Sequence, residues 1–324
     1  PMLYPLIFKP IFQERIWGGR RLEALYGKSL PAGKLIGESW EVSDRPGDES
    51  QIANGDLKGK TMRWLMENRA SELLGDFPAR HGRFPWLAKI LDAHDDLSVQ
   101  VHPPTCIAEA MGAESKTEAW YIAHAEPKAR LIAGLHRETT LELFKAKLGQ
   151  RDFSDCLHSL PAQTHKAIFI PSGRVHSLGA GTVVFEIQED SDTTYRVHDW
   201  NRAGMDGKPR ELHVEQALQS IDFKDTEPTL CDSPRQKEFG YSQYLIARQP
   251  GIFHLSQLQI ETGETLALPG NGVRLLAIID HCMTLQTQEH SLHFKPGDFA
   301  LIPASIKNPV IQGQNVRFLL TQPA

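Results

Sequence analysis

The chain has 324 residues, of which 40% are hydrophobic and 23% are charged, and it carries a formal net charge of −5. This length and composition are those of a globular protein with one large or two ordinary domains, and the acidic balance argues against a general binder of nucleic acid or of anionic membranes. The four cysteines form no CxxC pair, and no apolar run approaches the roughly 20 residues that cross a bilayer, so we expect a cytoplasmic protein without disulfides or a membrane span.

The first third of the chain predicts a mainly β protein. Residues 1–59 are rich in Gly, Pro and Trp, which is typical of short strands and turns. Residues 60–74 place apolar side chains at helical spacing and predict a helix. Buried strand is expected within 84–102, and two further strands are expected within 119–135.

A small helical insertion is predicted in the middle of this β scaffold. Thr139-x-x-Glu142 has the pattern of a capping box, and apolar residues follow at helical spacing. We therefore interpret residues 137–160 as the insertion. Strands are expected within 166–196 and a helix at 212–220. Residues 226–238 are expected to be a linker, and strands are expected again within 240–324.

A weak internal repeat links the two halves of the chain. Residues 166–172 resemble 298–304, because each segment is an apolar strand followed by a proline and a small residue. Five residues after the proline, the first copy has His176 and the second has Asn308. We infer two related β-barrels, of which the second lacks a metal.

Four residues have the side chains and the spacing expected of a divalent-metal site. Gln100 and His102 are two residues apart in an alternating apolar run, so on a strand both side chains would lie on one face. Glu118 and His176 would have to come from neighbouring strands. One carboxylate among four ligands leaves a bound divalent ion with net positive charge, which suits a Lewis acid better than a closed structural site. A single histidine is more often an ordinary buried residue, but the set of four favours metal binding.

Six segments together resemble the type I mannose-6-phosphate isomerase (phosphomannose isomerase) family, in the shorter form of Gram-positive bacteria. They occur in the family's order along nearly the whole chain: Ile16-Trp17-Gly18-Gly19, Gly37-Glu38-Ser39-Trp40-Glu41-Val42-Ser43, Leu97-Ser98-Val99-Gln100-Val101-His102-Pro103, Lys116-Thr117-Glu118, Pro171-Ser172-Gly173-x-x-His176 and Ser191-Asp192-x-x-Tyr195-Arg196-Val197. One departure is visible, because Pro104 and Thr105 stand where these enzymes often have acidic residues.

The resemblance implies a fold, a cofactor and an activity. The fold is mainly β, with two cupin-like (jelly-roll) β-barrels and the helical insertion. The expected catalytic, metal-binding domain comprises 1–136 and 161–225, and the expected metal-free domain comprises 240–324. The implied cofactor is one Zn²⁺ per chain, and the implied reaction is the interconversion of mannose 6-phosphate and fructose 6-phosphate through an enediol. By motif, the implied metal ligands are Gln100, His102, Glu118 and His176.

The resemblance also assigns Lys116 and Arg196 to the catalytic site. Lys116 is two residues from Glu118, so an extended backbone would direct both side chains into one cavity. The lysine would move a proton or contact phosphate, and the arginine would bind phosphate or enediolate oxygens. Without the family context, Lys116 would be interpreted as a surface lysine and Arg196 as a structural ion-pair partner of Asp199.

Three further polar residues are expected to bind substrate. Ser98 is in phase with the two ligands that follow it, so its hydroxyl would face the same pocket. Asp192 and Glu186 precede Arg196, and either carboxylate is a candidate acid/base partner or an orienting group for that arginine. Serine and aspartate also commonly serve turns and caps, which is the competing interpretation.

Two other functions would fit parts of this pattern. An iron dioxygenase of the cupin type would also use histidines and a glutamate, since ligand type fixes metal identity poorly. A sugar-phosphate-binding protein could keep the fold without the activity. Gln100 and the Lys-x-Glu context favour the isomerase over the first, and the complete ligand set with Arg196 favours it over the second. The expected partner is a small-molecule sugar phosphate, without nucleic acid or membrane, and the expected state is a monomer or weak homo-oligomer.

Overall fold

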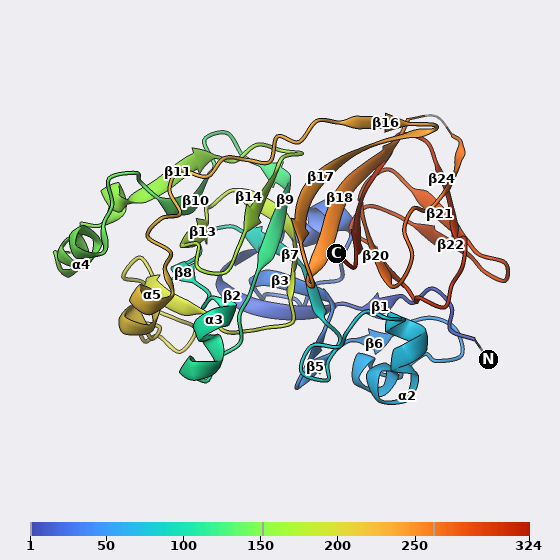
Figure 1. Cartoon of the computed structure of the whole chain (residues 1–324), viewed down its shortest axis with the longest axis horizontal. Helices are drawn as coiled ribbons and strands as arrows, with labels where there is room; N and C mark the ends of the chain where they lie inside the picture. The colour runs from blue at the N-terminus through green and yellow to red at the C-terminus, as the bar shows by residue number, and fades with distance from the viewer. Residues whose placement is uncertain (1, 151, 262) are drawn as a thin grey trace.

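Antiparallel strands dominate the chain and form two sandwiches that lie side by side (Figure 1). The computed structural model describes residues 2–150, 152–261 and 263–324. This architecture confirms the mainly β fold class that the sequence predicts.

The N-terminal sandwich pairs a six-stranded sheet with a five-stranded sheet. Their orders are β12-β9-β14-β7-β3-β2 and β11-β10-β13-β8-β15. Leu91 and Trp120 from the large sheet share one buried core with Leu131 and Leu178 from the smaller sheet, so apolar burial holds the two sheets face to face. The strand bounds are β2 Ile11–Gly19, β3 Ile36–Val42, β7 Trp86–Ala93, β8 Val99–Val101, β9 Glu118–Ala125, β10 Arg130–Leu135, β11 Leu157–Pro161, β12 Ala167–Ile170, β13 His176–Leu178, β14 Thr182–Glu189 and β15 Tyr195–His198.

The C-terminal sandwich pairs a six-stranded sheet, β16-β17-β18-β25-β20-β23, with a four-stranded sheet, β19-β24-β21-β22. Leu258 and Phe318 of the large sheet pack with Met283 and Ile311 of the small one. The strand bounds are β16 Gln236–Glu238, β17 Tyr241–Gln249, β18 Phe253–Ile260, β19 Thr265–Ala267, β20 Arg274–Asp280, β21 Met283–Gln286, β22 Ser291–Phe294, β23 Phe299–Ile302, β24 Val310–Gly313 and β25 Val316–Gln322.

The two sandwiches have the same strand order. Taken in chain order from first to sixth, the strands of both large sheets are arranged 5-4-6-3-2-1. The small sheets share the arrangement 3-2-4-1, and the N-terminal one adds β15 beyond β8. The repeat at 166–172 and 298–304 falls on β12 and β23, which hold equivalent edge positions. The prediction of two related halves is therefore confirmed.

The two large sheets pack against each other along their outer faces. Trp86 and Phe185 from the first sheet join Phe253 and Phe299 from the second in one cluster, and the Phe185 and Phe299 rings stack at 5.6 Å. Because side chains alternate along β7, the strand directs Trp86 to this interface and Lys89, three residues further on, to the opposite face.

The helices lie at the periphery of the sheets, and two details correct the sequence interpretation. Helices α2 (Met62–Leu74) and α5 (Val214–Ser220) were expected, but α1 (Arg21–Tyr26) and α3 (Thr105–Ala108) were not. Helix α4 (Leu141–Gly149) forms in the predicted insertion, yet its N-cap is Thr140, whose hydroxyl accepts the Leu143 N–H, and the Thr139 hydroxyl donates instead to Cys156 O. No helix among the described residues is long and apolar enough to cross a membrane.

Candidate metal centre and its cavity

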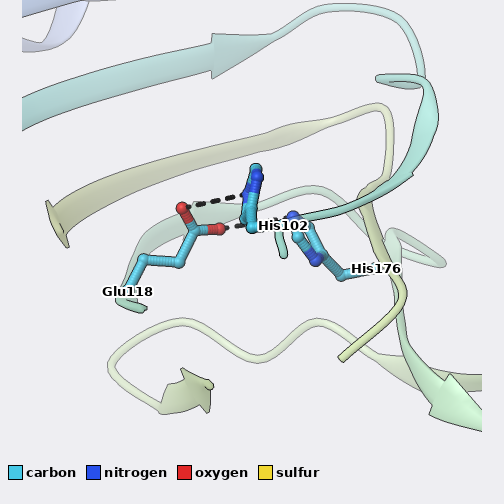
Figure 2. Close-up of side chains that lie close together, drawn as sticks. All are labelled: His102, Glu118 and His176. Carbon is cyan, nitrogen blue, oxygen red and sulfur yellow. Dashed lines mark ion pairs between the residues drawn. The ribbon is translucent and has the colours of Figure 1, made fainter. Parts of the chain in front are cut away.

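Three of the four predicted metal ligands lie together inside the N-terminal sandwich (Figure 2). His102 follows β8, Glu118 begins β9 and His176 begins β13, and their potential ligand atoms all lie within 4.8 Å of one another. Glu118 faces both rings, with His102 Nε2 3.6 Å from Oε2 and His176 Nε2 3.4 Å from Oε1. All three side chains are almost completely buried.

The outer nitrogen of each imidazole is fixed by a backbone carbonyl. His102 Nδ1 lies 2.8 Å from Thr193 O, and His176 Nδ1 lies 2.8 Å from Arg174 O. A carbonyl can only accept, so each Nδ1 carries a proton and each Nε2 directs a lone pair toward Glu118. Among the described residues, His102 Nε2 and Glu118 Oε1 find no hydrogen-bond partner although both are buried. Buried atoms of this kind are what a metal ion would satisfy.

The electrostatics of the cluster favour the ligand-competent protonation states. Burial lowers the pKa of His176 to about 3 and also lowers the pKa of His102, so both rings are neutral near pH 7. Burial alone would raise the pKa of the Glu118 carboxyl, but the neighbouring Lys116 ammonium is the largest opposing influence, and the pKa lies well below its usual range. Two neutral imidazoles and one carboxylate fit a borderline divalent metal without further proton loss.

Gln100 lies beside this cluster, opposite His176 in the β8–β13 register. Its Nε2 is 3.4 Å from His176 Nε2, while its Oε1 accepts a hydrogen bond from the Ser98 hydroxyl at 3.0 Å. A half-turn of the amide exchanges these two atoms. It would direct Oε1 toward the imidazoles and leave Nε2 to donate to Ser98, so the side chain can serve as an oxygen ligand.

A cavity of about 790 Å³ adjoins the cluster and collects the remaining predicted site residues. They come from four different strands or their ends: Ser98, Gln100, Lys116, Glu186, Asp192 and Arg196. Gln100 and Lys116 both line this cavity and contact the cluster, so these two side chains stand between the cavity and the cluster.

Lys116 stands between two buried carboxylates. Its Nζ is 3.0 Å from Glu118 Oε2 and 3.9 Å from Glu186 Oε1. Burial would lower the pKa of this lysine, but the two carboxylates outweigh burial and raise it. Glu186 accepts a hydrogen bond from Trp120 Nε1 at 2.8 Å, and burial together with Glu118 raises the pKa of its carboxyl.

Arg196 is available to an anion in the cavity. No ion pair forms to its guanidinium within the described part of the chain, and its Nε is buried without a hydrogen-bond partner. The competing interpretation paired it with Asp199, but that carboxylate is bound by Arg202 at 3.0 Å and by Arg210 at 2.6 Å.

Several cavity residues escaped the sequence interpretation, notably Glu38, Lys89 and Arg210. Lys89 Nζ lies 3.4 Å from Glu38 and 3.6 Å from Glu186. Burial opposes ionisation of Glu38, yet Lys89 and Arg15 outweigh it and lower its pKa to about 2. A signal was available for Lys89, because a lysine in the middle of a wholly buried strand needs a buried partner.

A buried His–Glu–His cluster inside a duplicated antiparallel sandwich defines a protein of the cupin class with a candidate metal site. Residues 6–117 match the family described as phosphomannose isomerase type I, catalytic domain. Mannose-6-phosphate isomerase ManA of Bacillus subtilis is 33% identical over 314 residues, which cover 95% of this chain and 96% of that protein. The chain belongs to the type I phosphomannose isomerase family.

Solved structures share this fold over almost the whole chain. The crystal structure of the mannose 6-phosphate isomerase from Bacillus subtilis superposes with a TM-score of 0.90 at 29% identity, covering 99% of this chain and 100% of that one. A mannose 6-phosphate isomerase bound with zinc and yttrium superposes with a TM-score of 0.76 at 18% identity, covering 99% and 100%. These likenesses place the cupin fold on the entire chain.

Proposed function

We propose that the protein is a metal-dependent aldose–ketose isomerase that interconverts mannose 6-phosphate and fructose 6-phosphate. The observation that carries this proposal is the buried cluster of His102, Glu118 and His176, which adjoins a cavity lined by the unpaired Arg196. A metal site and an anion-binding group on one cavity are what a phosphorylated sugar requires. Membership of the family supports the same substrate.

We propose that Gln100, His102, Glu118 and His176 hold one Zn²⁺ per chain. Zinc takes nitrogen and oxygen ligands of this type, and the related isomerase bound with zinc supports the choice. When bound, the ion would polarise a substrate oxygen and stabilise negative charge on it as the enediol forms.

The chain's own residues would then bind and deprotonate the sugar. Arg196 offers a planar, permanently charged fork to phosphate or enediolate oxygens. Ser98 and Asp192 line the same cavity and can hydrogen-bond the sugar. Lys116 Nζ and Glu186 Oε1 lie 3.9 Å apart and both residues line the cavity, so this pair can hold a proton and exchange it with a substrate carbon or oxygen beside them.

The domain division and cellular setting complete the proposal. The catalytic domain would comprise 1–136 and 161–225, with 137–160 as the insertion and 240–324 as the metal-free domain. By its pairing with β10, strand β11 (Leu157–Pro161) joins the catalytic sandwich although it lies mostly within the insertion. We propose a cytoplasmic enzyme that is a monomer or a weak homo-oligomer.

Chelation followed by zinc add-back tests the proposed activity. Purified protein should isomerise mannose 6-phosphate, lose this activity with its metal, and recover it with one equivalent of Zn²⁺. Oxygen uptake measured in parallel should stay at background. Oxygen turnover without isomerisation would assign the site to a dioxygenase, and isomerisation that is indifferent to metal would overturn the role of the cluster.

A further inference from the structure

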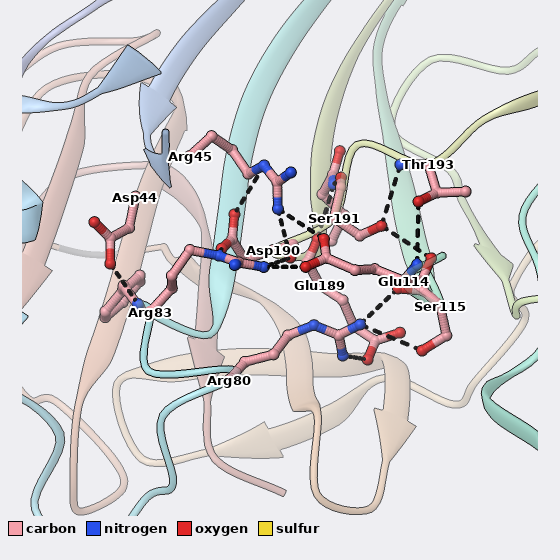
Figure 3. A network of polar contacts seen from close by, with 12 residues as sticks. Asp44, Arg45, Arg80, Arg83, Glu114, Ser115, Glu189, Asp190, Ser191 and Thr193 are labelled. Carbon is pink, nitrogen blue, oxygen red and sulfur yellow. Dashed lines mark hydrogen bonds and ion pairs between the residues drawn. The ribbon is translucent and has the colours of Figure 1, made fainter. Parts of the chain in front are cut away.

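A network of buried and half-buried charged side chains surrounds Glu114 and Ser115, which directly precede Lys116 (Figure 3). Its ion pairs join three arginines to three carboxylates: Arg45 to Glu114 and Asp190, Arg80 to Glu189, and Arg83 to Glu114 and Asp190. None of these six residues is among the described residues that line the cavity. The network therefore does not contact substrate directly. It can act only through residues that line the cavity or form the metal cluster.

Glu189 holds the peptide that separates Lys116 from Glu118. This residue ends β14 and is 3% exposed. Its Oε2 accepts the Thr117 N–H at 2.7 Å, and its own N–H donates to Thr117 O at 3.0 Å. Both polar groups of the Thr117 backbone are thus bound by one residue. Rotation of the backbone at Thr117 would turn Lys116 away from the cavity and Glu118 away from the two histidines together, because the two residues flank Thr117 on either side.

Arg80 fixes the Glu189 carboxylate in place. One guanidinium nitrogen donates to Glu189 Oε1, and the other donates to Ser115 O at 2.7 Å. The planar guanidinium therefore bridges Glu189 to the residue just before Lys116. Arg80 and Glu189 together bind the backbone at Ser115 and at Thr117, on both sides of the lysine.

A second branch of the network reaches His102. Glu114 N–H donates to Thr193 Oγ1 at 3.1 Å, and the Ser191 hydroxyl donates to Glu114 O at 3.1 Å. Thr193 O is the carbonyl that receives His102 Nδ1–H. Residues 114–117 are thus held in place next to Glu118 and also support Thr193, whose carbonyl orients the His102 ring.

We propose that Glu189 and Arg80 are positioning residues of the metal centre, which fix the Thr117 peptide so that Glu118 faces the two histidines and thereby set the affinity for Zn²⁺. This inference rests on the proposed function, because it takes Glu118 to be a metal ligand. Neither residue contacts the cavity, so the effect is transmitted through the backbone between Ser115 and Glu118.

Zinc affinity measured by competition with a chromophoric chelator tests the inference. Glu189→Gln keeps an acceptor for Thr117 N–H but removes the charge that holds Arg80, and Arg80→Met removes the donors. Each should weaken Zn²⁺ binding about tenfold or more, the range that outer partners of metal ligands show. Arg80→Lys should be intermediate, because a lysine can pair with Glu189 without also holding Ser115 O. The double variant should bind Zn²⁺ no more weakly than the weaker of the two single variants, because both substitutions remove the same restraint on the Thr117 backbone.

Asp92→Asn is the matched control. Asp92 is also fully buried in the N-terminal sandwich and also accepts from a backbone N–H, that of Arg21 at 2.8 Å, and from a guanidinium, that of the same Arg21 at 3.0 Å. It does not line the cavity. This variant should lower the unfolding midpoint of the metal-free protein while leaving zinc affinity within about twofold of wild type.

The outcomes separate the inference from the proposed activity. Zinc affinity in Glu189→Gln and Arg80→Met that matches Asp92→Asn would show that the network is structural only, and would overturn the inference. If Glu189→Gln does not fold, the affinities of Arg80→Lys and Arg80→Met decide in the same way. Wild-type protein that binds Zn²⁺ without isomerising mannose 6-phosphate would overturn the proposed activity and leave this comparison intact. Wild-type protein that binds no Zn²⁺ would overturn both.

Discussion

The two sandwiches share one strand order but bury very different side chains. Within the described residues, nine buried carboxylates all precede residue 200: Glu38, Glu41, Asp44, Asp92, Glu118, Glu186, Glu189, Asp190 and Asp199. The interior of the second sandwich is filled by side chains such as Leu258, Phe318 and Leu320. Buried charge opposes stability unless it is well paired. The first sandwich therefore contains the buried carboxylates that the proposed site needs, and the second contributes apolar burial to the shared fold.

The strand registers identify equivalent positions in the two interiors that carry different residues. Glu118 lies opposite Ile170 in the first sandwich, and Arg274 lies opposite Ile302 at the equivalent place in the second. The Arg274 guanidinium donates to Ile306 O at 2.8 Å and to Gly270 O at 3.2 Å. Glu186 lies opposite Trp120, two residues after Glu118, and Leu320 lies opposite Leu276, two residues after Arg274. Leu320 therefore takes the place of Glu186 in the second sandwich. A guanidinium in place of the ligand carboxylate repels any cation, so a duplicated backbone does not by itself create a second site.

Removing one imidazole should have the largest effect, because it would leave the first sandwich without a metal site, like the second. His176→Ala should lose its metal and its isomerase activity together, by more than the 10- to 100-fold typical of outer partners of metal ligands. The fold should persist, because His176→Ala loses one edge contact with Trp120 but leaves the core of Leu91, Leu131 and Leu178 in place. Elemental analysis, activity and circular dichroism of one preparation would check this, and wholesale unfolding would make the metal structural.

Arg196→Lys should separate anion binding from metal binding. A lysine keeps the charge but cannot form the bidentate fork, so turnover should fall about 100-fold, as for loss of one preorganised donor. Zinc content should stay at one equivalent per chain, because Arg196 is outside the ligand cluster. Steady-state kinetics and metal analysis measure the two effects, and near-normal turnover would refute the assigned role.

The acidic interior should also make the first sandwich sensitive to pH through Asp44. Burial raises the pKa of this carboxyl to about 6, although the Phe84 N–H and Arg63 oppose the shift. In the unfolded chain the value is about 4, so the folded state binds more protons in this window and its stability falls as pH rises from about 4 through 6. The full contribution is about 3 kcal/mol, at about 1.4 kcal/mol per pKa unit.

Asp44→Asn should remove this contribution. The stability of the variant relative to wild type should increase between about pH 4 and pH 7, by about 2 to 3 kcal/mol. Urea unfolding midpoints of both proteins across that range provide the measurement. A difference between the two that does not change with pH would contradict the shifted pKa.

Arg274→Met should have the smallest effect and should be confined to the second sandwich. The variant loses hydrogen bonds to Ile306 O and Gly270 O but also removes a buried charge, so the net loss of stability should be about 1 to 2 kcal/mol. Zinc content and turnover should match wild type. Reduced metal content would show that the two interiors are coupled across the Phe185–Phe299 interface.

The sequence predicts the elements whose patterns are local. Helix α2 and the strands around Glu118 follow from apolar spacing, and the repeat of a proline turn predicts the duplication. It predicts the wrong cap for α4, because Thr139 and Thr140 are both good N-caps and only the contact of Thr139 with Cys156 O selects the second. It misses α1, where six residues are too few to show a helical period.

The site residues likewise include some that local motifs predict and some that only the fold brings together. His102, Glu118 and His176 could be grouped from the sequence because their motifs are recognisable, and the structure brings their side chains together. The position of Lys89 in a buried strand indicates that it needs a buried partner, but nothing local shows that this lysine and the loop residue Arg210 face the same cavity as the ligands. The ion pair predicted as an alternative for Arg196 is absent because Arg202 and Arg210, which are closer to Asp199 in space, occupy that carboxylate.

The sequence by itself determined the β class, the duplication, the family and the candidate ligands, because each is written in residue types at short, regular spacing. The tertiary structure was needed to show that Arg274 takes the place of Glu118 in the second interior, which nitrogen of each histidine faces Glu118, and how Arg80 and Glu189 hold the Thr117 backbone. Most of these features depend on contacts between residues far apart in the chain, such as Glu118 with His102 at 16 positions and Arg80 with Glu189 at 109. Such contacts exist only after the sheets have packed, because packing fixes the register of strands that share no local pattern.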